Sequence, residues 1–326
     1  MIFHTFGDKK KKAVIFIHGL LTPWQIWKKS IEHFEKNYFV IVPELDSHTE
    51  QEKSSFQSVE KEAKQIKDFV IKNCDGKIFM LCGLSMGGRI AATTAALSDI
   101  DVENLVLDGA PLFPLPKLMI NIMAKNYIGI IRKSKKRNPK VLKNFTKYFM
   151  PENFLDAFLK IADNIEEDSL NKILSEVFVP FEFKKYDSVK KIFFMHGTKS
   201  NEILAKKSAV KMKEINPQTE IKSYEGYAHA QLACFESEKW LMEVSEWLKN
   251  KRMRSDWRYG NVLCGFRKGK EKTRGHSRAF GRTYDGKRKS FFARGSLQKI
   301  FERLHGLHVQ QKKQNARRIR HKTDGI

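Results

Sequence analysis

The segment from residue 77 to residue 97 contains the feature that most narrows the possible folds. Residues 77–82 (KIFMLC) are a short apolar run typical of a strand buried on both faces, and residues 86–97 are rich in alanine and other apolar residues, like a buried helix. Between them lies Gly83-Leu84-Ser85-Met86-Gly87, which fits the pattern G-x-S-x-G. This order predicts an α/β fold in which a sharp turn presents Ser85 at the end of a strand.

Further short apolar runs alternate with helical patterns along the chain. Expected strands are followed by expected helices and are found at 13–17 (AVIFI), 38–43, 104–108, 191–195 and 220–224. Helical spacing of apolar residues appears around 24–36, over 55–73 and again over 240–248, near the end of the alternating region. Such alternation predicts a doubly wound, mostly parallel sheet with helices on both faces.

The alternation is interrupted between residues 111 and 186. This stretch shows only helical patterns, at 115–132, 151–161 and 169–177. About 75 residues is far longer than a usual connection between neighbouring strands. We therefore expect a helical cap, inserted at about 111–186 above the edge of the sheet; a long, decorated crossover is the alternative.

Charge divides the 326-residue chain into two parts. Residues 251–326 contain 23 Lys and Arg against 5 Asp and Glu, whereas residues 1–250 contain 38 against 32. We expect a domain over 1–250 and a basic C-terminal extension over 251–326. The extension is interpreted as a disordered appendage, as a segment that binds nucleic acid or an anionic membrane, or as a segment foreign to the fold.

Two further features bear on location and cofactors. No stretch approaches 18 consecutive apolar residues, and the five-residue run at 13–17 is too short for the core of a signal peptide, so we expect a cytoplasmic protein. The four cysteines lack the spacing of a metal site or a disulfide framework, which favours free thiols in a reducing compartment. We expect neither a metal nor a cofactor.

The residue types around Ser85 suit a nucleophile. Gly83 and Gly87 remove side chains that would collide where the strand and the helix close on each other. The hydroxyl then stands above the strand ends, at a helix N-terminus whose dipole favours developing negative charge.

Two other motifs follow strands at the same edge of the expected sheet. After the first apolar run, His18-Gly19 suggests an oxyanion loop, with Gly19 allowing the turn and the amides of Leu20 and Met86 as donors. After the last strand, Glu225-Gly226-Tyr227-Ala228-His229 places His229 where a general base can reach the serine. His196, which ends the fifth strand, and His48, which follows the second, compete for this role, whereas His4 and His33 belong to no motif.

The segments FIHGL, GLSMGG, HGT and GYAH, in this order, resemble the α/β-hydrolase superfamily in its capped esterase and lysophospholipase-like branch. The resemblance covers residues 13–249. It implies the α/β-hydrolase fold and a Ser-His-acid triad that transfers acyl groups through an acyl-enzyme. The resemblance implies no cofactor.

The position of the acid departs from the family pattern. The family's aspartate would fall at Ser200, three residues after Gly197. The carboxylate is expected either at Glu202, two residues further on and one methylene longer, or at Asp108, at the end of the preceding strand. A third possibility is that no acid is present and the site is a Ser-His dyad.

The resemblance favours a serine hydrolase that cleaves carboxylic esters, either a carboxylesterase or an enzyme like monoacylglycerol lipases and lysophospholipases. Its partner is then a small ester with an apolar acyl or alcohol part. Alternatives are a thioesterase or amidase with the same site, a catalytically weak or inactive binding protein on the same scaffold, and a nucleic-acid or membrane-binding protein dominated by residues 251–326.

Overall fold

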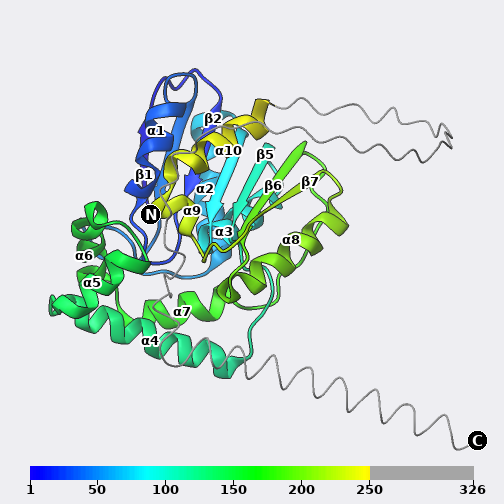
Figure 1. Cartoon of the computed structure of the whole chain (residues 1–326). Coiled ribbons are helices and arrows are strands. Elements are labelled where there is room, and N and C mark those ends of the chain that lie inside the picture. The colour runs from blue at the N-terminus through cyan, green and yellow to red at the C-terminus, as the bar shows by residue number, and fades with distance from the viewer. Residues whose placement is uncertain (250–326) are drawn as a thin grey trace, which may run out of the picture.

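A seven-stranded sheet runs through the centre of the molecule (Figure 1). This computed structural model describes residues 1–249, and the expected basic extension at 251–326 lies outside them. The strands lie in the order β1-β3-β2-β4-β5-β6-β7, and only the β1–β3 pair is antiparallel. Their bounds are Ile2–Phe6 (β1), Ala13–Ile17 (β2), Phe39–Glu44 (β3), Lys77–Leu84 (β4), Asp101–Asp108 (β5), Lys191–Gly197 (β6) and Thr219–Tyr224 (β7). The expected mostly parallel sheet is confirmed.

The edge strand β1 has no counterpart among the expected strands. Its sequence, IFHTF, is short and only half-buried, so it lacks the continuous apolar run of a central strand. It is held by antiparallel pairing with β3 from Ile2–Glu44 to Phe6–Val40.

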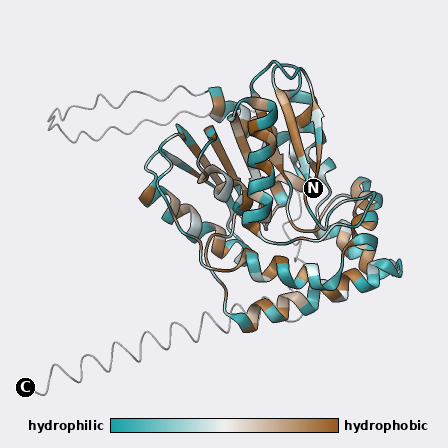
Figure 2. Cartoon of the chain, turned by 180° about the vertical axis from the view of Figure 1, so that it is seen from behind, coloured by the Kyte–Doolittle hydropathy of each residue, from teal (hydrophilic) through white to brown (hydrophobic). Residues whose placement is uncertain are grey.

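Helices cover both faces of the sheet because alternate strand residues point to opposite faces. In β2, Ile15 and Ile17 pack into one core with helices α2 (Val59–Cys74), α3 (Met86–Ala95) and α8 (Ile203–Ile215). Val14 and Phe16 pack into a second core with Trp27 and Trp240. This face is covered by η1 (Trp24–Trp27), α1 (Lys28–Phe34), α9 (Gln231–Phe235) and α10 (Ser237–Lys249). Figure 2 shows the hydrophobic strands enclosed between helices whose outer faces are hydrophilic.

Between β5 and β6 the chain leaves the sheet and forms the expected helical cap (Figure 1). Its helices are α4 (Lys117–Lys135), α5 (Pro139–Tyr148), η2 (Glu152–Phe154), α6 (Leu155–Asn164) and α7 (Glu167–Val177). Helix α4 packs against α5, α6 and α7. Within the described residues, no helix is both long and apolar enough to cross a membrane.

Helix α5 was not among the expected helices, although the sequence does carry a signal for its start. The side chain of Asn138 accepts a hydrogen bond from the Val141 N–H, and Pro139 occupies the first turn. An N-cap asparagine followed by proline is a common way for a helix to begin.

Candidate active site

Ser85 lies in the turn between β4 and α3, with its backbone at φ 54° and ψ −117°. A positive φ is costly for a residue with a Cβ, and the surrounding chain holds this one in place. The Ser85 N–H donates to the Asp108 carbonyl at 2.7 Å. A Cβ on Gly83 would lie 2.1 Å from the Gly87 carbonyl oxygen, and one on Gly87 would lie 2.4 Å from that of His18. The turn therefore requires glycine at both positions.

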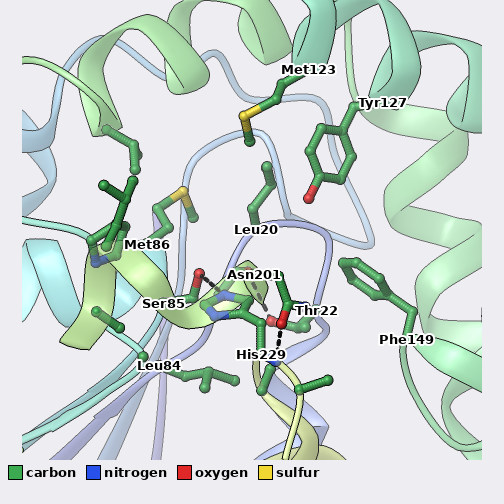
Figure 3. A pocket seen from close by; sticks show the side chains of 18 of the residues that line it. Leu20, Thr22, Leu84, Ser85, Met86, Met123, Tyr127, Phe149, Asn201 and His229 are labelled. Atoms are coloured by element: carbon green, nitrogen blue, oxygen red, sulfur yellow. Dashed lines mark hydrogen bonds between the residues drawn. The ribbon is translucent and has the colours of Figure 1, made fainter. Parts of the chain in front are cut away.

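Three of the expected site residues form one hydrogen-bonded chain. Figure 3 shows the link between Ser85 and His229. His229 Nε2 lies 2.7 Å from Ser85 Oγ, and its Nδ1 bonds to Glu202 Oε1. The other oxygen of the Glu202 carboxylate accepts the Gly197 N–H at 3.2 Å, and the side chain is 2% exposed. The arrangement suits transfer of the serine proton to the imidazole, with a carboxylate behind it.

Glu202 reaches His229 because of the local path of the chain after β6. Residues Ser200–Glu202 form a single 3-10 turn, η3, from which α8 continues. Asn201, which no sequence motif identified, lies beside it and accepts the His229 backbone N–H at 3.3 Å.

Asp108, the alternative acid, is also buried but faces another partner. Its Oδ2 accepts the Trp240 Nε1–H at 3.0 Å, and within the described chain no hydrogen bond joins it to His229. Burial, with a further contribution from the nearby Glu202 charge, raises the pKa of Asp108 to about 7. The structure therefore brings Glu202, and not Asp108, to the imidazole.

The electrostatics of His229 reflect two opposing effects. Removal from bulk water lowers the pKa of the imidazole, but the charge of Glu202 and its hydrogen bond raise it more, so that the net pKa lies above 6.5. A carboxylate in this position favours the imidazolium that forms when the serine loses its proton.

The loop after β2 holds one peptide group in a defined orientation. The Gly19 carbonyl accepts three hydrogen bonds: from His18 Nδ1 at 2.9 Å, from Thr22 Oγ1 at 2.8 Å and from the Thr22 N–H at 3.3 Å. Because the peptide bond is planar and trans, the Leu20 N–H points away from this cluster. Among the described residues neither the Leu20 nor the Met86 N–H has a hydrogen-bond partner, so both are available to a ligand.

Gly19 lies next to the serine turn. The residue in the left-handed region is Leu21, at φ 56°, and not Gly19. A Cβ at Gly19 would lie 3.3 Å from the Leu84 carbonyl oxygen and 3.4 Å from Ser85 Cβ. A side chain at this position would be in tight contact with the serine turn.

His18 and His48 tie this loop to the loop after β3. The Leu45 N–H donates to His18 Nε2 at 3.1 Å, and the Leu21 N–H donates to His48 Nε2 at 3.0 Å. Each ring is fully buried and each accepts from the other loop, so each must be neutral. Burial lowers the pKa of His18 to about 3 and that of His48 to about 4. His48 follows a strand but matches no motif. Its contact with the Leu21 loop joins residues far apart in the sequence and could not be predicted from it.

Replacing His48 should disturb this loop selectively. In His48→Leu the Leu21 N–H loses its acceptor, and we expect kcat for an ester to fall by about 10–100-fold, since complete loss of one oxyanion donor costs about 10²–10³. His48→Gln, whose side-chain oxygen can take the place of Nε2, should recover most of the loss. Steady-state kinetics of both variants test this, with melting curves as the check on folding. Equal losses in the two variants would argue against the hydrogen bond.

An apolar pocket of about 460 Å³ opens above Ser85, between the sheet and the cap (Figure 3). The floor includes Leu20, Met86 and His229. The cap contributes mostly apolar side chains, among them Met123, Ile130, Phe145, Phe149, Leu174 and Phe178. The arrangement provides a nucleophile, a base, two free amides and a water-poor cavity at one place.

Comparisons with known proteins agree with the fold. A family model described as alpha/beta hydrolase fold matches residues 12–129. The chain is 29% identical over 100 residues to the human monoacylglycerol lipase ABHD6, and the match covers 30% of each protein. The chain thus matches only about a third of the length of this curated relative.

Solved structures extend the likeness to most of the chain. An α/β-hydrolase family protein of Desulfitobacterium hafniense has 23% identity and a TM-score of 0.61, covering 76% of this chain and all of the other. A thermophilic esterase of Thermogutta terrifontis has 19% identity and a TM-score of 0.55, covering 76% and 92%. At these identities the likeness establishes the fold.

Proposed function

We propose that this chain is an α/β-hydrolase that hydrolyses carboxylic esters through an acyl-enzyme formed on Ser85, since a family model described as alpha/beta hydrolase fold matches residues 12–129 and similar solved structures share the fold. The observation that carries the proposal is the hydrogen-bonded chain from Ser85 through His229 to Glu202 at the floor of an apolar pocket. Monoacylglycerol lipase and esterase activities, named for two of the similar proteins, support an ester as the substrate.

In the proposed first step, Ser85 Oγ attacks the ester carbonyl while His229 Nε2 takes its proton. The negative charge on the carbonyl oxygen is stabilised by the Leu20 and Met86 N–H groups, and that on Glu202 stabilises the imidazolium. His229 then returns the proton to the leaving alcohol, and the acyl group remains on Ser85.

In the second step water replaces the alcohol. His229 takes a proton from the water, the hydroxide attacks the acyl-enzyme, and Ser85 leaves with the proton that His229 returns. The acid is released and the site is restored. Every proton transfer in this sequence uses side chains of the chain itself.

The apolar lining from the cap suits the acyl part of the substrate. Each methylene that enters such a pocket contributes about 0.8 kcal/mol when it is fully buried. We therefore expect kcat/KM for p-nitrophenyl esters to rise by on the order of tenfold or more from acetate to octanoate. A series of p-nitrophenyl esters of increasing chain length measures this, and a flat series would contradict an acyl site in the cap.

Labelling with a fluorophosphonate separates an enzyme from an inactive binding protein of the same fold. The reagent should attach to Ser85, and a mass spectrum of the labelled peptide locates it. A protein that neither reacts with the reagent nor hydrolyses any of the p-nitrophenyl esters would refute the proposed function.

A further inference from the structure

The first two helices of the cap account for the net positive charge of residues 1–250. The segment 111–150 contains ten Lys and Arg and no Asp or Glu, whereas the rest of residues 1–250 contains 28 against 32. All ten of these basic side chains are exposed. Charges of one sign gathered on one part of a surface attract a partner of the opposite sign.

Four of the ten basic side chains have partners within the cap. Arg132 and Arg137 form ion pairs with acidic residues of α7 and α6, Lys135 donates to a backbone carbonyl, and Lys147 lies over the ring of the adjacent tyrosine. The ammonium groups of the other six make no hydrogen bond or ion pair with any residue that the structure describes, and we call these six the basic cap face: Lys117, Lys125, Lys133, Lys136, Lys140 and Lys143.

Helix α4 has two opposite faces, and only one of them belongs to the pocket. Met123, Tyr127 and Ile130 line the pocket above Ser85. A Cβ added to Gly129, on the opposite face, would meet no atom within 4 Å, so this side of the helix is open to solvent. The helical spacing of three to four residues places the following side chains on the same open face as Gly129: Leu118, Ile122, Lys125, Lys133 and Lys136.

The open face of α4 is apolar at one end and basic along the rest. Leu118 is 69% exposed, more than any other exposed large apolar side chain of the described residues, and Ile122 is partly exposed one turn later. The phosphates of a nucleic acid would pair with the lysines but would leave the leucine without a contact. The surface of an anionic membrane suits both, because headgroups attract the ammonium groups and the boundary with the acyl chains accepts apolar side chains.

We propose that the basic cap face, together with Leu118 and Ile122, docks the cap on a membrane that contains anionic phospholipids. In Figure 1, α4 runs along the edge of the molecule, away from the sheet. Since the pocket lies on the other side of this helix, the pocket is then separated from the membrane by one helix, about 10 Å in diameter. The inference goes beyond ester hydrolysis and does not depend on it, because docking is measured without a substrate.

The test uses the full-length protein and a local readout, since residues 251–326 are also basic and can bind the same membrane. Lysines are acetylated in the presence of vesicles, and mass spectrometry measures the reactivity of each one. Vesicles of phosphatidylcholine with phosphatidylglycerol should protect Lys125, whereas vesicles of phosphatidylcholine alone should not. Lys28, an exposed lysine of α1, lies far from α4 in Figure 1 and should react equally with and without vesicles.

A charge variant tests the lysines of the face. Each basic residue near an anionic surface strengthens binding by about fivefold, so Lys133→Gln combined with Lys136→Gln should raise the lipid concentration that half-protects Lys125 by on the order of tenfold. The matched control removes two exposed lysines from α1 and α8 and should leave that concentration unchanged: Lys28→Gln combined with Lys207→Gln.

An apolar variant separates a membrane from a nucleic acid. Leu118→Ser should raise the half-protecting lipid concentration by about tenfold, because the side chain no longer enters the membrane. Met242→Ser, which removes a side chain of α10 that is 61% exposed, is the control and should have no effect. Melting curves of all variants check that each is folded.

Three results would overturn the inference. The first is a Lys125 that reacts equally with and without anionic vesicles, and the second is a charge or apolar variant that behaves like its control. The third is protection of Lys125 by a short DNA duplex but not by vesicles, which would identify a nucleic acid as the partner of this face.

Discussion

Ser85→Ala is expected to lower kcat for p-nitrophenyl esters by about 10⁶-fold, the size of loss seen when the nucleophile of a serine hydrolase is removed. Without Oγ no acyl-enzyme forms, and His229 has no proton to take from the chain. The variant should remain folded, because Ser85 already occupies a strained backbone position with φ 54° and alanine fits in the same space. Activity assays and a melting curve measure the two effects separately.

Ser98→Ala is a matched control, since it removes a hydroxyl in the turn after α3, outside the pocket. It should retain full activity and still react with the fluorophosphonate, whereas Ser85→Ala should not react. Turnover retained in Ser85→Ala would contradict the assignment of the nucleophile.

Glu202→Gln is expected to reduce kcat by about 10²–10⁴, somewhere up to the loss seen when the carboxylate of a catalytic triad is neutralised. The amide has no charge to stabilise the imidazolium, and its NH₂ group can hold the wrong tautomer of His229. Steady-state kinetics with a p-nitrophenyl ester measure the loss.

Asp108→Asn is the comparison that separates the two candidate acids. Its side-chain oxygen can still accept the Trp240 Nε1–H, so we expect activity close to that of the unaltered protein. A large loss in Asp108→Asn together with normal turnover in Glu202→Gln would place the acid at the end of β5 instead of after β6. Normal turnover in both would indicate a Ser-His dyad.

The pH dependence of kcat/KM provides a second test of the Glu202→Gln variant. The base must be neutral to act, so activity of the unaltered protein should rise with pH and reach half its plateau above pH 6.5, because Glu202 raises the pKa of His229. In Glu202→Gln that contribution is gone and the lowering by burial remains. The midpoint in kcat/KM should therefore move to lower pH, and a midpoint that moves upward or stays fixed would contradict the coupling.

Much of the fold follows from local sequence patterns. The central strands are continuous apolar runs because both of their faces are covered by helices, and they could be predicted from this alone. The local sequence patterns did not lead to a prediction of edge strand β1 or of helix α5. β1 exists only because β3 offers it a hydrogen-bonding partner, whereas α5 does carry a local signal, the N-cap Asn138 followed by Pro139.

For the candidate site, local sequence patterns were enough to propose two residues: Ser85, in a turn that only glycines on both sides allow, and His229, in the loop after the last strand. Tertiary structure decided what depends on distant segments. Glu202 follows β6 and Asp108 ends β5, and only the path of η3 brings the Glu202 carboxylate to His229. His48 likewise contacts Leu21, 27 residues earlier. Hydrogen-bond partners far apart in sequence leave no local pattern, because the sheet and not the chain sets the distance between them.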